Sequence, residues 1–483
     1  MKFLALPWLE MAIGIAFVGS IFVLFFRDPV RVFRWAVVFT ASAFAATFMA
    51  WLAFYLDTPI DLIRRSSPQM YLFGQLVFKL DELSSPLVPA IALMHLLIVV
   101  ATARTHMRRF SSSWSMIAET IKLATFSCTT PWILIGLLSI ATIPPLIELL
   151  QRGRSIRVYA AHMGLFVGLL VLGWSAVCLS GTTAGIAPWW ATLPLLLAIL
   201  VRCGTVPAHC WLTDWFEHAS PGIALLFVLP LGSVYAAVRL VLPIAPGWVL
   251  VSIGLLSLFT AIYASGMATI QRDTRRFFAH LFLSHSSLVL VGLELHTDLS
   301  LTGSFCLWFS VILSLGGFGL TLRALEARFG RLSLARFHGL YDHSPTLAVC
   351  FLLTGLASVG FPFTLGFIST EILVDSAVEA SPMVGIIVVG TAALNGIAVL
   401  RVYFLLFTGA RHSSAVSLKL GWRERLAVLT LSALILGGGL YPQPGVMSRE
   451  RAAAEVRAVR ALHGAHEEPA PEHAPPPKSK PPA

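Results

Sequence analysis

A short segment midway along the chain combines a cation, a proline, a histidine and a carboxylate within an apolar stretch. It runs R-C-G-T-V-P-A-H-C-W-L-T-D from Arg202 to Asp214. A cation buried in hydrocarbon costs roughly 3 kcal/mol on insertion scales, so it normally faces a bundle interior or a water-filled path. Pro207 interrupts a helix and frees a backbone carbonyl, and His209 is able to titrate near neutral pH. The combination indicates a path for an ion or a proton.

Each of these residues also has a structural interpretation. Arg202 lies near the end of its apolar segment, so its charged group could reach the cytoplasmic surface while its stem stays in the membrane. His209 could cap a backbone group in a loop. Arg239, just before Pro243, could be an anchor at the membrane interface rather than part of a path.

A second polar group follows in a later apolar segment. His280 and His285 lie five residues apart, which places them on neighbouring parts of one helix. Serines flank His285 on both sides and could hold a chain of water molecules. A single histidine within the membrane is often satisfied by a hydrogen bond to another helix, and that remains the alternative.

A second interruption occurs at G-F-P-F-T-L-G-F-I-S-T-E, where Pro362 and Gly366 are the expected helix breakers. Glu371 at the end of this motif is expected at membrane depth, where an unpaired carboxylate favours its protonated form and could carry a proton. Arg401 in the following segment is the last charged candidate. Two broken helices, one in each half, are typical of ion sites in transporters built from inverted repeats.

The composition places these motifs in a membrane. The chain is 57% hydrophobic and 12% charged, whereas soluble domains carry about 25% charged residues. Apolar runs of about 20 residues recur along it. It has no phosphate-binding glycine loop, nucleophile elbow, metal-ligand cluster or dinucleotide motif, and its six cysteines show no CxxC spacing. The sequence predicts an all-α polytopic membrane protein with no catalytic site, metal or cofactor of its own.

About fourteen membrane-spanning helices are expected, and a further stretch, 363–378, continues the twelfth beyond Pro362. Basic residues follow nearly every odd-numbered helix, which places those loops in the cytoplasm and both termini on the opposite side. These loops explain the net charge of +10 without a nucleic acid partner. The expected helices are 9–26, 35–56, 86–104, 115–129, 132–150, 159–180, 188–206, 222–242, 248–270, 275–295, 301–325, 344–361, 382–408 and 426–441, followed by a polar helix at about 448–466.

The motifs resemble those of the antiporter-like membrane subunits of respiratory complex I, of Mrp-type multi-subunit cation/proton antiporters and of two-component inorganic-carbon pumps. The family pattern of a lysine followed by P-x-H-x-W-L-P-D-A is matched from Arg202 through Trp211 to Asp214. The segments through His285 and through Arg401 follow further family patterns, and the matches keep the family order over roughly 115–410.

This resemblance implies fourteen helices, two inverted five-helix repeats, broken seventh and twelfth helices, and proton movement along a central polar axis. It divides the chain as follows: 1–114, the first three helices and an outer loop; 115–242, the first repeat; 248–409, the second repeat; 410–447, the last helix; and 448–483, a polar, proline-rich tail expected to be disordered.

The chain departs from the family at the charged positions. Where the family has a glutamate on the fifth helix, this chain has Ser139, and the lysine of the seventh helix is Arg202. The charged position of the twelfth helix is Thr370, with Glu371 beside it. Arginine stays protonated in proteins and is a poor proton carrier. The family's glutamate–lysine switch is therefore absent at its usual positions, and the histidines and Glu371 would carry more of the path.

Three functions remain open. The first is a proton-translocating subunit of a complex I-like, NADH:quinone oxidoreductase-type assembly in a bacterial inner membrane, with other membrane subunits as partners. The second is the membrane subunit of an energy-coupled inorganic-carbon pump that works with a soluble zinc-binding, carbon-hydrating partner. The third is a structural scaffold whose ion path no longer conducts.

Overall fold

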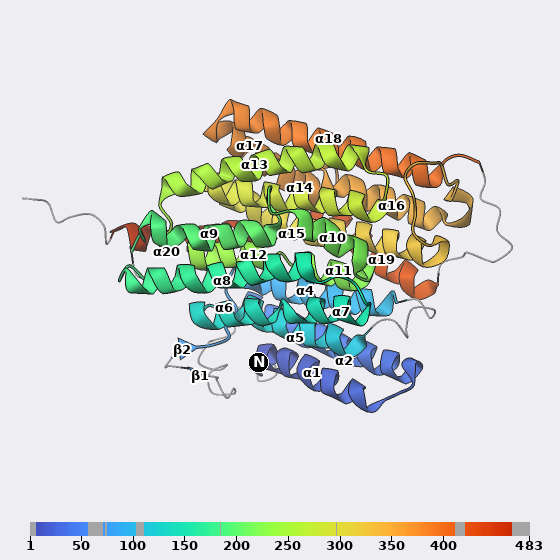
Figure 1. Cartoon of the computed structure of the whole chain (residues 1–483), viewed down its shortest axis with the longest axis horizontal. Coiled ribbons are helices and arrows are strands. Elements are labelled where there is room, and N and C mark those ends of the chain that lie inside the picture. The colour runs from blue at the N-terminus through green and yellow to red at the C-terminus, as the bar shows by residue number, and fades with distance from the viewer. Residues whose placement is uncertain are drawn as a thin grey trace, which may run out of the picture.

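The computed structural model describes residues 6–56, 71–72, 75–102, 111–183, 185–295, 297–410 and 421–465. These residues form a bundle of roughly parallel and antiparallel helices, with α1 and α2 at one edge and α17 and α18 at the other (Figure 1). A two-residue antiparallel hairpin, β1 (Tyr71–Leu72) and β2 (Gln75–Leu76), lies in the connection before α4. The prediction of an all-α polytopic membrane protein is confirmed.

All the expected apolar segments are helical. The first part contains α1 (Trp8–Phe22), η1 (Val23–Phe25), α2 (Pro29–Tyr55) and α4 (Ser84–Val100). The first predicted repeat contains α5 (Ser112–Ser127), α6 (Pro131–Ile140), α7 (Ile143–Gln151), α8 (Arg157–Leu179), α9 (Trp189–Cys203), α10 (Cys210–His218), α11 (Pro221–Val228), α12 (Gly232–Ala236) and η3 (Ala237–Val241).

The second predicted repeat contains α13 (Gly247–Ile270), α14 (Thr274–Glu294), α15 (Asp298–Phe329), η4 (Tyr341–His343), α16 (Pro345–Ser358), α17 (Leu365–Ala380) and α18 (Pro382–Phe407). The chain continues through α19 (Trp422–Leu440) into α20 (Gln443–Ala465). Among the described helices, nine are long and apolar enough to cross a membrane, or ten if the bent pair α19 and α20 counts as one span. Shorter helices joined at breaks make up other expected spans, and the total of fourteen stays a prediction.

Burial identifies the centre of the bundle. In the most apolar 18-residue stretch of each helix, all residues of α14 and 89% of those of α15 are buried inside the bundle. The corresponding share is only 33% in α1, α2, α8 and α18. The exposed faces of these outer helices carry large apolar side chains such as Phe17, Leu172 and Ile386, as expected for helices that contact lipid. The side chains of α14 are therefore in the best position to contribute to an internal path.

Helix starts follow from local chemistry. Asp28 accepts a hydrogen bond from the backbone N–H of Val30 and precedes Pro29, the first residue of α2. Asp273 accepts from the N–H groups of Arg275 and Arg276 at the start of α14. A carboxylate at this position satisfies N–H groups that have no partner within the helix.

The predicted break at Pro207 separates α9 from α10, and the one at Pro362 separates α16 from α17. Gly204 ends α9 with φ +78° and Gly360 follows α16 with φ +88°, a left-handed conformation that glycine adopts without strain. The fifth expected span is also divided, at Ala141 between α6 and α7. The sequence motifs did not reveal this third break.

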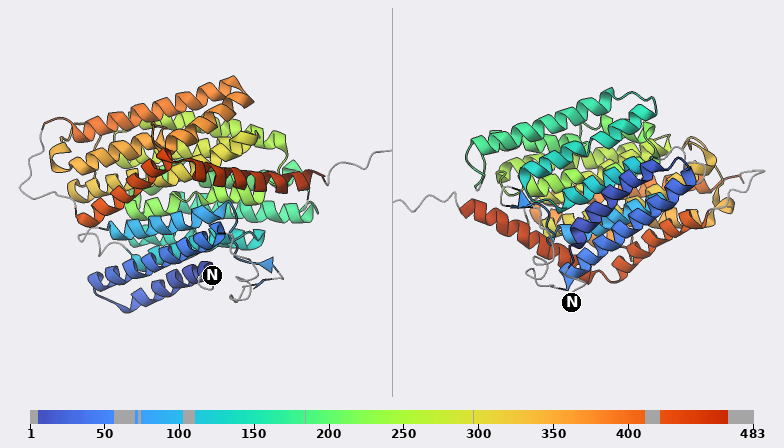
Figure 2. Two further views of the ribbon diagram at one scale, coloured as in Figure 1. Left: turned by 180° about the vertical axis from the view of Figure 1, so that it is seen from behind. Right: turned by 90° about the horizontal axis from the view of Figure 1, so that it is seen from below.

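The polar helix expected at 448–466 is present as α20, and it bends away from α19 by 81° (Figure 2). Arg449 is only 4% exposed and donates to the carbonyl oxygens of Glu82 and Leu83 just before α4. Arg460 donates to the carbonyl oxygens of Leu242 and Ala245 beyond η3. Residues 448–465 of the tail that was expected to be disordered are therefore helical and bound to the bundle, and 466–483 lies outside the described residues.

Candidate functional site

The cation at the first break lies against aromatic rings. The guanidinium of Arg202, in the last turn of α9, is 4.0 Å from the ring centroid of Phe227 and 5.2 Å from that of Trp211. Trp211 belongs to α10 and donates from Nε1 to the carbonyl oxygen of Val201, 2.8 Å away. Planar guanidinium groups stack well on aromatic faces. Arg202 therefore joins the two halves of the broken helix as a fixed positive charge and does not reach out to the cytoplasmic surface.

Two buried ionisable residues beside this break were missed by the sequence interpretation. Glu119 on α5 is 0% exposed, and neither of its carboxylate oxygens has a hydrogen-bond partner among the described residues. Lys122, one turn further along, is 7% exposed and donates to the carbonyl oxygen of Leu226. The available signal was a carboxylate and an ammonium three residues apart within the expected helix 115–129.

The serine at the family's glutamate position is satisfied locally. Ser139 donates to the carbonyl oxygen of Ile135, 2.7 Å away, within its own helix. Its helix, α6, packs against α5, which carries Glu119 and Lys122. The first half therefore keeps a buried carboxylate and a buried lysine, but on a different helix from the one that the family pattern indicates.

His209 and His280 lie close to one another beside the first break. His209 precedes α10, packs edge-on against the ring of Tyr263, and has no described hydrogen-bond partner at Nδ1. His280 interacts electrostatically with His209, and its Nδ1 is 2.8 Å from the carbonyl oxygen of Arg276. The two predicted histidines thus come together from different helices.

His285 connects α14 to the second break. Its Nδ1 is 2.8 Å from the carbonyl oxygen of Leu281, and its Nε2 is 2.8 Å from that of Ser358, the last residue of α16. A neutral imidazole has one N–H and donates once, whereas the protonated ring donates twice. The position of His285 thus couples its protonation to the contact between α14 and the broken helix.

A hydroxyl–amide pair extends this part of the axis. Asn395 of α18 is fully buried and donates through Nδ2 to Oγ of Ser284, 2.9 Å away. Ser284 in turn donates to the carbonyl oxygen of Ala261. The sequence interpretation included the serines near His285 but not Asn395, because its distance of 111 residues in sequence gives no hint of the contact.

The second break is tightly packed. A Cβ atom at Gly366 would overlap the carbonyl oxygen of Ala357, so only glycine allows α17 to approach the end of α16 this closely. Gly439 of α19 has the same requirement against the backbone of Phe363 and Thr364. Pro362 is exposed, and Gly366 is the residue that sets the geometry of this break.

Glu371 lies on the exposed side of α17, away from the bundle interior, and its place in a proton path stays a prediction. The buried residues of α17 recur at helical spacing through Gly366, Ser369 and Leu373, and Glu371 projects from the opposite, exposed side. Thr370, at the family's charged position, lies next to Gly360 instead. The motif predicted a helix here, from residue 363, but the helix begins only at Leu365, and the direction of the Glu371 carboxylate did not follow from the motif.

Arg239 and Arg401 lie away from the two breaks, Arg239 in the last turn of η3 and Arg401 within α18. Arg239 pairs with Asp81, which precedes α4, and its guanidinium is 5.0 Å from the ring of Tyr235. Arg401 donates to the carbonyl oxygen of Gln271, which follows α13. Both contacts join segments that are distant in the sequence.

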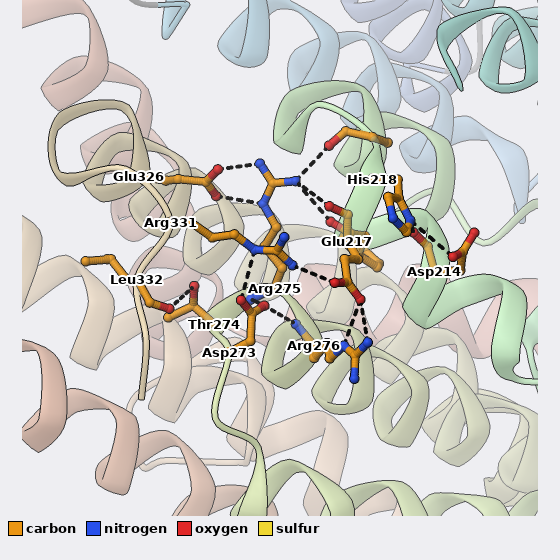
Figure 3. A network of polar contacts seen from close by, with 12 residues as sticks. Asp214, Glu217, His218, Asp273, Thr274, Arg275, Arg276, Glu326, Arg331 and Leu332 are labelled. Carbon is orange, nitrogen blue, oxygen red and sulfur yellow. Dashed lines mark hydrogen bonds and ion pairs between the residues drawn. The ribbon is translucent and has the colours of Figure 1, made fainter. Parts of the chain in front are cut away.

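A polar network holds the end of α10 against the start of α14 and the end of α15 (Figure 3). Arg275 forms two hydrogen bonds with Glu326 and also donates to the carbonyl oxygens of Phe216, Glu217 and Ala219 at the end of α10. Asp214 is part of this outer region and pairs with His218, 3.1 Å away, rather than with a group on the axis.

Glu217 joins the two halves within this network. It pairs with Arg276 at 2.7 Å and with Arg331 at 3.1 Å. Partial burial alone would raise the pKa of Glu217, but the hydrogen bonds and positive charges of these two arginines outweigh it and hold the pKa below its usual range. The carboxylate is therefore charged across the neutral pH range.

Comparison with known proteins confirms the resemblance. The family model described as NADH:quinone oxidoreductase/Mrp antiporter, transmembrane, matches residues 175–395, which include both breaks. Subunit N of an NADH-quinone oxidoreductase from Chromohalobacter salexigens is 29% identical over 266 residues, covering 52% of this chain and 55% of the relative. Subunit M from Pseudomonas aeruginosa is 27% identical over 277 residues, covering 53% and 51%. The matches thus span about half of the chain and about half of each curated relative.

Solved structures share the fold over nearly the whole chain. A chain of respiratory complex I from Thermus thermophilus superimposes with a TM-score of 0.80 at 22% identity, covering 94% of this chain and 100% of that chain. A chain of the Mrp complex from a Dietzia species gives a TM-score of 0.76 at 18% identity, covering 96% and 100%. The fold of this chain is therefore shared with a chain of each of these two membrane complexes.

Proposed function

We propose that this chain is a proton-translocating membrane subunit of a complex I-like, NADH:quinone oxidoreductase-type assembly. The observation that carries the proposal is the pair of helix breaks inside the bundle, with Arg202 held at the first and His285 bound to the second. A broken helix exposes backbone groups and titratable side chains to one another at membrane depth. The relatives named as subunits M and N, and the shared fold, support this reading.

Protons fit the axis better than sodium ions do. Sodium requires several oxygen ligands around one point, as other hard cations do. The inward side chains near the second break are an imidazole, serine hydroxyls and one amide, and they form a sequence of donors and acceptors rather than a cage. Groups of this kind pass protons along hydrogen bonds.

The energy source and the partners would come from the assembly. The relatives named as NADH-quinone oxidoreductase subunits support an assembly in which other subunits carry electron transfer. We place the chain in a bacterial inner membrane, with other membrane subunits as neighbours and both termini on the non-cytoplasmic side, because basic loops follow the odd-numbered helices.

The test combines purification with a transport measurement. A tagged chain is purified from native membranes, co-purifying proteins are identified, and proton uptake into inside-out vesicles is followed with a pH-sensitive dye. We expect peripheral redox subunits and electron-donor-dependent proton uptake that is lost when the chain is deleted. Recovery of a soluble zinc protein instead would support the inorganic-carbon pump, and unchanged proton uptake per electron without the chain would support the scaffold.

A further inference from the structure

A buried acid–base pair lies in the first half, on α5. Glu119 and Lys122 are three residues apart, and this spacing places two side chains on neighbouring parts of one helical face. Neither carboxylate oxygen of Glu119 has a described hydrogen-bond partner. His95 of α4 interacts electrostatically with Lys122, and its Nε2 is also without a described partner. Buried polar groups are normally paired, so unpartnered ones at this depth indicate a site for water or a mobile proton.

A cavity reaches Lys122 from one end of the bundle. It encloses about 480 Å³ of atom-free space including its open mouth, and the cavity as a whole has room for about one water molecule. Its wall includes Ser115, Ala118 and Lys122 of α5 and Glu148 of α7. The outer end lies at the start of α5 and the end of α7, next to loops that the basic residues place in the cytoplasm. Lys122 is eight residues beyond Trp114, or about 12 Å along the helix.

The charges around the pair allow it to bind one proton more than the number that makes the cluster neutral. Lys122 interacts electrostatically with both Glu119 and Arg202. The guanidinium of Arg202 stays protonated, so it contributes a fixed positive charge. With Glu119 ionised and Lys122 neutral, the cluster has no net charge, and one more proton on either group makes it +1. Burial disfavours net charge, so the additional proton is the one most easily gained and lost.

We propose that Glu119 and Lys122 form the proton-loading site of the first half, filled from the cytoplasmic side through this cavity. The inference rests on the proposed function and names the residues that begin its path. A hydronium ion in the cavity gives a proton to the neutral amine of Lys122 and is left as water. Lys122 then releases that proton through a bridging water to the carboxylate of Glu119, which becomes a neutral acid while the amine returns to its neutral form. Tyr159 of α8 packs on the rings that cover Arg202 and closes the cluster on that side.

Substitutions at Lys122 separate a carrier from a structural cation. Lys122→Met removes the transferable proton, and the opposite charges of Glu119 and Arg202 still cancel. The assembly should therefore form while proton uptake falls by roughly 10-fold or more. Lys122→Arg keeps the charge but cannot release its proton, and it should stay inactive. Lys79→Met, at an exposed lysine, is the matched control with unchanged uptake. Normal uptake in Lys122→Met, or its recovery in Lys122→Arg, would overturn the proposal.

Infrared spectroscopy tests the same site without a transport measurement. The full chain in lipid nanodiscs is titrated in H₂O and D₂O, and the band of a protonated buried carboxylic acid is followed. Glu294 of α14 is a second buried carboxyl, 5% exposed, so two bands that shift in D₂O are expected. One band is lost in Glu119→Gln and the other in Glu294→Gln, and both persist in Glu379→Gln, at an exposed carboxylate of α17. Absence of a titrating band from Glu119 overturns the loading site even if the assembly pumps protons. A titrating band in a chain that pumps none refutes the proposed function instead.

Discussion

Around the break between α9 and α10 the inward side chains are charged. Around the break between α16 and α17 they are neutral, apart from a histidine that is able to gain or lose a proton. Arg202, Glu119 and Lys122 surround the first break and aromatic rings cover it. His285, Ser284 and Asn395 surround the second. The same helix order thus presents two different chemistries at its two interruptions.

This difference assigns different tasks to the two halves. A fixed cation sets the electrostatic potential of its surroundings and biases nearby groups, but it does not carry protons itself. An imidazole between two carbonyl oxygens changes its hydrogen bonding when it gains or loses a proton. We therefore expect the first half to respond most to changes of charge and the second half to changes of geometry and hydrogen bonding.

The largest effect is expected from Gly366→Ala in the second half. The added Cβ would overlap the carbonyl oxygen of Ala357, and the close contact between α16 and α17 has no room to relax. Such overpacking should destabilise the chain by about 3 kcal/mol or more, which thermal unfolding of the purified protein would measure. Gly390→Ala on α18, where a Cβ meets nothing within 4 Å, is the control. Equal melting temperatures for the two variants would show that this break is not rigid.

His285→Ala should come next, with proton uptake reduced by roughly 10-fold or more and the assembly intact. The substitution removes the hydrogen bonds to the carbonyl oxygens of Leu281 and Ser358. Proton uptake by vesicles that contain equal amounts of the assembly measures the effect. His162→Ala on the outer helix α8 should leave uptake unchanged. Uptake at the wild-type rate in His285→Ala would mean that the histidine only stabilises the contact between helices.

Arg202→Lys should have a small effect because it keeps the positive charge at the first break. We expect unchanged assembly and equal or faster proton uptake, since lysine is able to release a proton and arginine is not. Arg202→Met is the comparison, and it should lose both the contact with the ring of Phe227 and the charge. Misassembly of the lysine variant would show that stacking on the rings, rather than charge, is the main role of Arg202.

The smallest effect concerns the joint between the halves. The pKa of Glu217 is held below its ordinary value of 4.5 by Arg276 and Arg331, so its stabilising charge is present above about pH 4.5 and is lost as the pH falls further. The contribution should be about 1 kcal/mol or less, as for other partly exposed ion pairs. Thermal unfolding between pH 6 and 4 should show a smaller decrease in Glu217→Gln than in the wild type. A matching decrease in both would exclude this carboxylate as the cause, and Glu450→Gln on α20 is the control.

Helix positions, both predicted breaks and the membrane class followed from the sequence because long apolar runs and internal prolines are local signals. The polar helix after Tyr441 was recognised for the same reason. Residues such as His285 and Arg202 were identified because a polar group in an apolar run is visible one residue at a time.

Contacts between distant helices were not predictable in this way. Asn395 binds Ser284 across 111 residues, and Glu371 turned out to face outward because its direction depends on where α17 begins. Glu119 and Lys122 were overlooked because the family pattern directs attention to the fifth helix, where Ser139 stands. A pairwise contact needs the packing of the helices, which one sequence does not contain.

The two arginines of α20 have a consequence for how the chain is made. Arg449 binds carbonyl oxygens 366 and 367 residues earlier in the chain, just before α4, and Arg460 binds those beyond η3. These contacts cannot form until the ribosome has passed all the helices that they fasten. The segments before α4 and after η3 therefore enter the membrane without these contacts. The contacts form only when α20 has been synthesised and docks on the bundle.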